Sequence, residues 1–251
     1  MSRTRLDQAM QNRGLVRSRS QAVSYIRLGK VTVNRKPVEK PGQLVGSKDE
    51  INLAAEEQYV GRAALKLASV ASELGLDFRN KTVLDVGSST GGFTDFALRN
   101  GASKVIAVDV GTGQMHPKLR GYSKIELHEK TDIRDVRLKR TGVSSKEKVV
   151  SIETPEIVLI DVSFISLREI LPHIKTLTGK DTLIVAMVKP QFESGAEQVN
   201  KGVIKNDSIR RQILKDFESW AKNLFVMVDK ADSKVGGAKG NLERFYLLKK
   251  T

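Results

Sequence analysis

The sequence predicts an α/β protein, in which a mostly parallel sheet is closed at one edge by an antiparallel hairpin and preceded by a small α+β domain. From residue 82 onward, apolar strand-like segments alternate with helical or irregular stretches, which is the pattern of a parallel sheet. The last two apolar segments, 224–231 and 243–250, are joined by a glycine-containing loop too short for a helix, which favours an antiparallel pair. The start of the chain has shorter elements and is far more basic.

The first 53 residues predict a compact module. A short helix stopped by Gly14 comes first, and a second helix, capped by Ser18 or Ser20, is stopped by Gly29. Short β-type segments separated by Pro and Gly turns follow.

The charge of this module indicates its kind of partner. Lys+Arg exceed Asp+Glu by 43 − 29 = 14 in the whole chain, and residues 1–40 hold ten cations against two acids, a net of +8. Because each cation placed on a phosphate releases counterions, such a patch favours a polyanionic partner. The cations that we expect to contact it are Arg3, Arg5, Arg17, Arg19, Arg27, Lys30, Arg35 and Lys36.

The stretch RLDQAM…GLVRSRSQAVSYIRLGKVTVNRKPVEKPGQLV…DEINL resembles the S-four type RNA-binding domain. The resemblance covers about 50 residues and implies binding to structured RNA, mostly through shape and phosphates. We therefore expect an RNA-binding domain at 1–58, a linker at 59–62 and a second domain at 63–251.

Composition excludes several other classes. The chain has no cysteine, and its three histidines are scattered, so we expect neither disulfides nor a metal site. No apolar run approaches the roughly 20 residues of a membrane span, and the N-terminal segment lacks the apolar centre of a secretory signal. The expectation is a soluble, cytoplasmic protein with no obligate membrane partner; the sequence does not predict its oligomeric state.

The second domain opens with an amphipathic helix over 62–75, and its strands follow in order. The apolar segments predicted as strands before the closing pair are 82–87, 104–111, 156–163 and 182–190. Residues 83–98, VLDVGSSTGGFTDFAL, run from the first strand through a glycine-rich turn into a helix.

That turn has the spacing G-x-x-x-G-G. No Lys-Ser/Thr follows it, so a triphosphate site is poorly supported, and Ser89 stands where a dinucleotide fold would want its middle glycine. Two roles remain for the glycines of this turn: they let the backbone approach another kind of ligand closely, or they only allow tight packing. Asp85 could hold the turn or a ligand amine, Asp109 ends the next strand where an acid binds ribose hydroxyls, and Asp132 is placed for the exocyclic amine of a base. Contacts to an amine, to ribose hydroxyls and to a base, without a phosphate-binding site, suit S-adenosylmethionine.

The run D-V-G-S-S-T-G-G-F-T-D resembles the first motif of the FtsJ-like ribose methyltransferases, which implies a Rossmann-like class I methyltransferase sheet. The resemblance implies S-adenosylmethionine as the cofactor. The residues expected to bind it are Asp85, Gly87, Ser88, Ser89, Gly91, Gly92, Phe93, Asp109, Asp132, Ile133 and Asp161.

Four charged residues match the Lys-Asp-Lys-Glu catalytic set of that family in order. Lys66 lies in GRAALKL, Asp161 in LIDVSF, Lys189 in VKPQFE and Glu243 in NLERFYLL. The resemblance implies that Lys189 is the base that takes the proton of a ribose 2′-hydroxyl. Lys66 and Asp161 would tune and orient it, and Glu243 would hold the lysines or the ribose.

The combination of the two domains is similar to the TlyA (haemolysin A) family across essentially all 251 residues. The resemblance implies 2′-O-methylation of cytidine in the ribosomal RNA of the small subunit, the large subunit or both. One departure is Gly61, where the family often has serine; losing that helix cap would loosen the hinge between the domains.

Two other classes stay open at this level: a membrane-active cytolysin, which the family's older name suggests, and a non-catalytic ribosome-binding or assembly factor. A small-molecule methyltransferase would leave the basic module without a role. Residues 115–124 and 139–155 are RNA-facing loops or plain surface, and 193–208 is an active-site loop or a simple connector.

Overall fold

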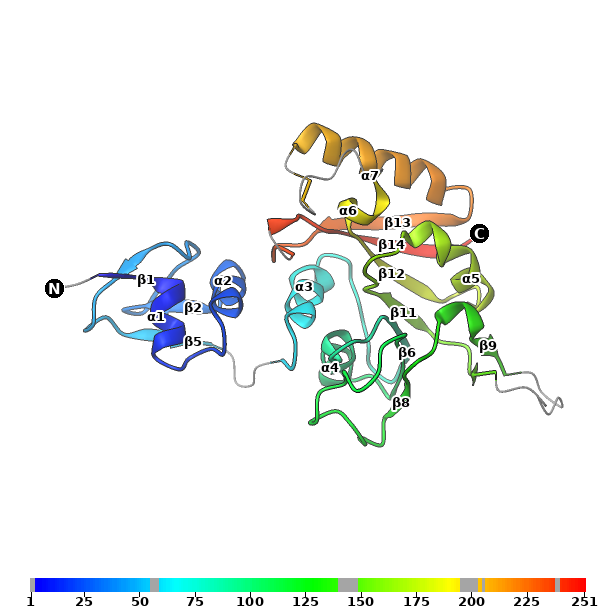
Figure 1. Ribbon diagram of the computed structural model, residues 1–251, viewed down its shortest axis with the longest axis horizontal. Helices are drawn as coiled ribbons and strands as arrows, with labels where there is room; N and C mark the ends of the chain where they lie inside the picture. The colour runs from blue at the N-terminus through cyan, green and yellow to red at the C-terminus, as the bar shows by residue number, and fades with distance from the viewer. Residues whose placement is uncertain (1–2, 55–58, 140–148, 195–202, 205, 238–239) are drawn as a thin grey trace.

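The computed structural model describes residues 3–54, 59–139, 149–194, 203–204, 206–237 and 240–251. Its centre is a seven-stranded sheet in the order β13-β14-β12-β11-β6-β7-β8 (Figure 1). The strands are β6 (Thr82–Val86), β7 (Lys104–Val108), β8 (Ile125–His128), β11 (Ile157–Ile160), β12 (Leu183–Val188), β13 (Phe225–Asp232) and β14 (Arg244–Lys250). Strands β6, β7, β8, β11 and β12 are parallel, while β14 is antiparallel to both β12 and β13. The predicted parallel sheet with an antiparallel edge hairpin is confirmed.

Helices cover both faces of this sheet. Helices α3 (Arg62–Ala71) and α4 (Gly92–Arg99) pack on one face, and α5 (Leu171–Thr176) and α7 (Asp207–Ala221) pack on the other. Successive side chains of a strand point to opposite faces, so β6, β7, β11, β12, β13 and β14 each contribute to both hydrophobic cores. The result is a three-layer sandwich.

The strand order places a crevice beside β6. The chain runs outward from β6 through β7 to β8 and then returns to the other side of β6 at β11. Loops after β6 and β11 therefore leave in opposite directions, and open α/β sheets bind ligands at this switch point. Gly87 has φ +80°, and a Cβ atom there would lie 2.8 Å from the carbonyl oxygen of Asp161, so glycine allows the two strand ends to approach.

The shorter elements of the sheet domain complete the list. They are the strands β9 (Arg137–Leu138) and β10 (Ser151–Ile152), which pair in parallel, the 3-10 helices η1 (Ile133–Asp135) and η2 (Leu167–Glu169), and α6 (Pro190–Glu193).

The N-terminal module contains two helices and two small sheets. Its elements are β1 (Thr4–Arg5), α1 (Leu6–Asn12), α2 (Arg19–Arg27), β2 (Val31–Val33), β3 (Lys36–Pro37), β4 (Leu44–Val45) and β5 (Ile51–Leu53). Ser18 caps α2 by accepting a hydrogen bond from Gln21 N at 3.2 Å. Gly14 and Gly29 follow the two helices with positive φ, as the sequence predicts.

This module is packed against the sheet domain. Its hydrophobic core includes Leu65 of α3 and Val235, which follows β13. Within the sheet domain, the backbone N–H of Lys234 donates to Ser69 Oγ of α3 at 3.2 Å. Figure 1 shows α2 of the module beside α3. Two segments of the sheet domain therefore complete the core of the basic module.

Several local expectations are refined. The helix predicted over 62–75 ends at Ala71 and continues as turns to Gly75. Within 115–124, Met115 and Leu119 are buried while the cations between and after them are exposed. The predicted loops 139–155 and 193–208, and the predicted RNA-binding domain 1–58 at residues 1–2 and 55–58, lie partly outside the described residues.

Gly61 precedes α3 without a side-chain cap. A Cβ atom at this position would lie 2.8 Å from Thr90 Oγ1, so glycine allows the glycine-rich turn to pack closely on the start of α3. The expected loosening of the hinge stays a prediction.

No helix in the described part of the chain is both long and apolar enough to cross a lipid bilayer.

Candidate active site

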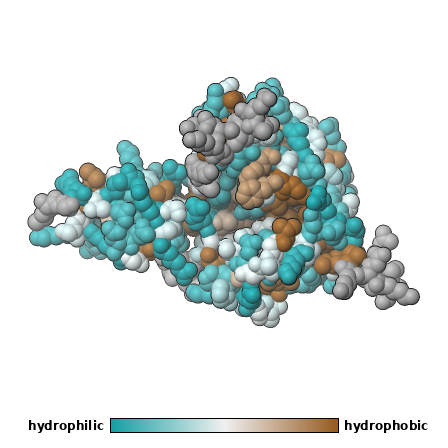
Figure 2. All heavy atoms as spheres, in the orientation of Figure 1, coloured by the Kyte–Doolittle hydropathy of each residue, from teal (hydrophilic) through white to brown (hydrophobic). Residues whose placement is uncertain are grey.

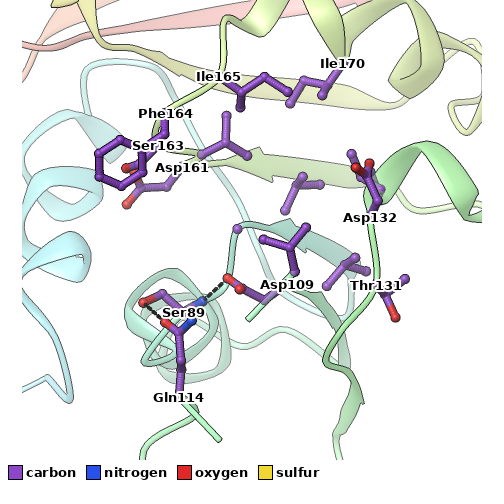
Figure 3. A pocket seen from close by; sticks show the side chains of 16 residues that line it. Ser89, Asp109, Gln114, Thr131, Asp132, Asp161, Ser163, Phe164, Ile165 and Ile170 are labelled. Atoms are coloured by element: carbon purple, nitrogen blue, oxygen red, sulfur yellow. Dashed lines mark hydrogen bonds between the residues drawn. The ribbon is translucent and has the colours of Figure 1, made fainter. Parts of the chain in front are cut away.

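Two neighbouring cavities open at the carboxyl ends of the parallel strands. The larger has a volume of about 340 Å³ and extends from the end of β11 past the glycine turn to Asp109 and Asp132 (Figure 3). The smaller has a volume of about 160 Å³ and is lined by lysines and carboxylates. They share the residues Gly87, Ser89, Asp161 and Ser163. A ligand in the larger cavity would therefore reach the charged groups of the smaller one.

Two acids predicted from the sequence line the larger cavity. Asp109 accepts hydrogen bonds from the backbone N–H groups of Ser89 at 2.8 Å and Gly111 at 2.7 Å, which fix its carboxylate. Asp132 pairs with Arg134, whose Nη2 lies 2.7 Å from Asp132 Oδ2. The hydrogen bonds from Arg134 lower the pKa of Asp132, so this carboxylate stays ionised. Figure 3 shows these acids on different sides of the pocket from Asp161.

Apolar side chains form much of the wall between these acids. Ile133, Ile165 and Ile170 line the cavity, and Val110 at its rim is 72% exposed. Figure 2 shows hydrophobic side chains gathered near the centre of one face of the molecule. Apolar walls with a few placed polar groups are typical of small-molecule sites.

Asp85 lies beneath the glycine turn and is completely buried. Its Oδ2 accepts a hydrogen bond from Thr94 Oγ1 at 2.6 Å. In the described part of the chain, Asp85 Oδ1 and the buried Oγ of Ser88 have no hydrogen-bond partner. Burial raises the pKa of Asp85 to about 7. Both residues line the smaller cavity, so these unpaired atoms are available to a polar ligand group.

The later residues of the turn have mixed surroundings. Gly92 and Phe93 line the smaller cavity, and Phe93 also packs against Phe245. Gly91 lines neither cavity. A Cβ atom on Gly91 would lie 2.5 Å from the side chain of Met115, so the residue allows the loop after β7 to pack on the turn. A contact of Gly91 with cofactor stays a prediction.

The four predicted catalytic residues come together as two ion pairs. Lys189 Nζ lies 2.6 Å from Asp161 Oδ1, and Lys66 Nζ lies 2.6 Å from Glu243 Oε2. All four side chains are at most 14% exposed. Burial raises the pKa of Glu243, while Lys66 opposes that effect and Asp161 adds to it. The two pairs are therefore electrostatically coupled within one buried site.

The structure adds residues that sequence reasoning missed. Ser163 Oγ accepts a hydrogen bond from Lys189 Nζ at 2.7 Å. Buried Glu193 accepts from Ser166 Oγ at 2.6 Å and Leu167 N at 2.7 Å, so it joins the segment after Lys189 to the loop after β11. Ser163 and Glu193 follow closely after Asp161 and Lys189 in the sequence, and that closeness is the signal that could have identified them.

Phe164 lies at the rim of the larger cavity. It is 92% exposed and has φ +67°, a backbone conformation that a bulky residue rarely adopts. Its ring lies 5.3 Å from that of Phe192. Such strain at an exposed aromatic residue points to a functional surface.

All eight cations predicted to bind RNA are exposed on the N-terminal module. The described residues contain no group of three or more His, Asp or Glu side chains placed to hold a metal ion.

Comparison with known proteins agrees with this architecture. Residues 59–251 match the FtsJ-like methyltransferase family, and residues 4–51 match the S4 domain. The fold and the paired lysines and carboxylates thus define an FtsJ-like methyltransferase carrying an N-terminal S4 domain.

Relatives that match over nearly the whole chain define the family more closely. The chain is 34% identical to the 16S/23S rRNA (cytidine-2′-O)-methyltransferase TlyA of Mycobacterium tuberculosis, over 98% of this chain and 90% of that protein. It is 36% identical to Hemolysin A of Brachyspira hyodysenteriae, over 95% and 97% of the two chains. A solved structure from Streptococcus thermophilus that carries the hemolysin name superimposes with a TM-score of 0.70 at 34% identity, covering 100% of this chain and 90% of that one. The chain belongs to the TlyA and haemolysin A family of FtsJ-like methyltransferases.

Proposed function

We propose that this protein transfers a methyl group from S-adenosylmethionine to the ribose 2′-hydroxyl of a cytidine in ribosomal RNA. The observation that carries the proposal is the junction of the two cavities, where Asp161 and Ser163 line both and contact Lys189. By their names, the TlyA relatives act on cytidine of 23S rRNA or of 16S and 23S rRNA, which supports the choice of substrate.

The residues of the larger cavity suit S-adenosylmethionine. Asp109 is held as an acceptor for ribose hydroxyls, and Asp132 lies where it would accept from an exocyclic amine. The isoleucines of the wall would contact an adenine ring. Asp85 Oδ1 and Ser88 Oγ, buried and unpaired in the described part of the chain, face the neighbouring cavity, where the amino-acid end would lie. When bound, the cofactor supplies a methyl group attached to a positively charged sulfur.

The chain's own residues would then handle the proton of the 2′-hydroxyl. Lys189 Nζ is proposed to accept it, while Asp161 orients that nitrogen by an ion pair and Ser163 by a hydrogen bond. The Lys66–Glu243 pair holds a second lysine in the same buried site. Removal of the proton increases the nucleophilicity of the ribose oxygen as it forms the new bond to carbon.

The basic module is proposed to hold the RNA, and Phe164 to contact a base near the site. An exposed aromatic ring beside the cavity can stack on an unpaired base, which is a common way to hold single-stranded RNA. The structure offers no separate observation that favours lysis of membranes or a purely structural role on the ribosome.

The experiment is methyl transfer from labelled S-adenosylmethionine to separated small and large ribosomal subunits prepared from cells that lack the protein. Alkaline hydrolysis of the product follows, because a 2′-O-methyl group blocks cleavage of the adjacent phosphodiester. Label in alkali-resistant dinucleotides with cytidine at the 5′ side is the expected result, and it names the subunit. Absence of label on both subunits and on free RNA, with cofactor binding intact, would overturn the proposal in favour of a binding factor.

A further inference from the structure

A buried acid organises two arginines of the basic module. Asp7 is on α1, and its side chain is 1% exposed. Arg5 of β1 donates to both of its carboxylate oxygens, from Nε at 3.1 Å and from Nη2 at 3.0 Å. Arg19, the first residue of α2, donates from Nε to Asp7 Oδ2 at 2.8 Å. One carboxylate therefore connects guanidinium groups from two different elements.

Asp7 is charged in this position. Burial alone would raise its pKa, but the hydrogen bonds and charges of Arg5 and Arg19 outweigh burial, and the net effect lowers the pKa. Asp7 Oδ1 also accepts from the backbone N–H of Gln8 at 3.0 Å, which fixes the carboxylate on the helix. The ionised acid is thus a rigid anchor for its two arginines.

The arginines keep much of their donor capacity. Their side chains are 49% and 51% exposed. In the part of the chain that the structure describes, Nη1 of Arg5 and both terminal nitrogens of Arg19 make no hydrogen bond. Arg5 also packs on Gly42, where a Cβ atom would lie 3.0 Å from its Nη1. These contacts restrict the two guanidinium groups, while about half of each arginine side chain stays exposed.

We propose that Asp7 is a positioning residue that holds Arg5 and Arg19 as one preformed site for a phosphate of the RNA backbone. The proposal rests on the proposed function, since it assumes that this module binds RNA. Guanidinium groups recognise phosphate oxygens through pairs of N–H donors, and a lysine ammonium lacks that geometry. Holding long side chains in place before binding removes much of the entropy cost of ordering them.

If Asp7 positions the arginines, neutralising Asp7 should change RNA affinity in the direction opposite to the one that charge alone predicts. Neutralising an acid on a surface that binds a polyanion should tighten binding, because repulsion is removed. If Asp7 positions the arginines, Asp7→Asn must weaken binding instead. Glu39 is the matched control, because it is the other acid of residues 1–40 and is exposed.

The experiment measures binding of the full chain to the separated ribosomal subunits from cells that lack the protein, over a series of KCl concentrations. We expect Asp7→Asn to weaken binding roughly tenfold and Glu39→Gln to leave it unchanged or tighter. Arg19→Lys keeps the positive charge at this position and the carboxylate of Asp7, but it loses the paired N–H donors of the guanidinium group. It should weaken binding severalfold. Arg211→Lys, an exposed arginine of α7, should bind like wild type. Methyl transfer at saturating subunit should stay near wild type in Asp7→Asn, so that KM changes and kcat does not.

The outcomes separate the two proposals. Asp7→Asn binding as tightly as Glu39→Gln would overturn the positioning role while leaving the methyltransferase proposal intact. If Asp7→Asn proves unfolded in a thermal melt, Arg19→Lys decides, and wild-type affinity in that variant overturns the role. Failure of the wild-type chain to bind or label either subunit would overturn the proposed function itself, and this inference with it.

Discussion

Lys189 Nζ lies 2.6 Å from Asp161 Oδ1 while it donates to Ser163 Oγ at 2.7 Å. The carboxylate of Asp161 holds this nitrogen by its charge, and the hydroxyl of Ser163 holds it by accepting a hydrogen bond. Asp161 and Ser163 thus orient the proposed base, and their positions at the junction of the two cavities place it beside the proposed methyl donor.

The Lys66–Glu243 pair should be important for stability as well as activity. Lys66→Met leaves the Glu243 carboxylate buried without its cation, and breaking a buried pair in this way costs about 3–5 kcal/mol of unfolding free energy. A double-mutant cycle with Glu243→Gln, followed by urea denaturation, measures the coupling. The exposed pair Lys81–Glu156 is the control, where Lys81→Met should cost less than about 1 kcal/mol. Equal costs at the two pairs would contradict this account.

Asp85 should make stability depend on pH. Its pKa is raised by burial to about 7 in the folded state, above the value of roughly 4 expected when unfolded. Between those values the folded state holds the proton and the unfolded state has lost it, so stability falls as pH rises through this window. Asp85 should contribute roughly 1 kcal/mol per pH unit to this slope, and Asp85→Asn should lose that contribution. Urea unfolding at several pH values checks this; exposed Asp181→Asn should keep the wild-type slope.

Phe164→Ala should impair use of RNA without weakening cofactor binding. Stacking of a base on an aromatic ring is worth about 1–3 kcal/mol, which corresponds to an increase in KM for the ribosomal subunit of roughly 5- to 150-fold. Steady-state kinetics with separated subunits and calorimetry with S-adenosylmethionine together test this. Val226→Ala, at a 53% exposed position of β13, should change neither quantity. Weaker cofactor binding in Phe164→Ala would instead place this ring against the cofactor.

Asp109 should be a determinant of cofactor affinity. Asp109→Ala removes the acceptor proposed for the ribose and also releases the N–H groups of Ser89 and Gly111. We expect affinity for S-adenosylmethionine to fall at least tenfold, measured by equilibrium dialysis. Asp135→Ala, a nearby exposed acid outside the cavity lining, should bind normally. Unchanged affinity in Asp109→Ala would show that the cofactor lies elsewhere.

The spacing of apolar residues and the positions of glycine, proline and helix-capping residues predicted most of the fold. The strand-to-helix run around Gly87 and the glycine-joined hairpin at the end of the chain were readable because their signals are local. The sequence analysis does not predict helix α7 as a separate element, although its signals are local: Asn206 caps it, and its buried apolar residues recur at helical spacing.

Other features depend on contacts that no local pattern contains. The sequence identified the four charged residues, but not their pairing. Lys189 and Asp161 meet because they follow the neighbouring strands β12 and β11, and Lys66 of α3 meets Glu243 just before β14. Likewise, Val235 entering the core of the basic module is a long-range contact. The packing of Met115 against Gly91 is another, and it explains why that glycine lies away from the cavities.

The most direct test of the central claim compares Lys189→Met with Lys180→Met, an exposed lysine, in single-turnover methyl transfer to separated ribosomal subunits. Binding of S-adenosylmethionine is measured in parallel. The account predicts that Lys189→Met binds the cofactor within a fewfold of wild type but loses alkali-resistant label by roughly 10²–10⁴-fold, while Lys180→Met behaves as wild type. Formation of alkali-resistant label by Lys189→Met at a rate close to wild type would contradict the role of Lys189 as the base.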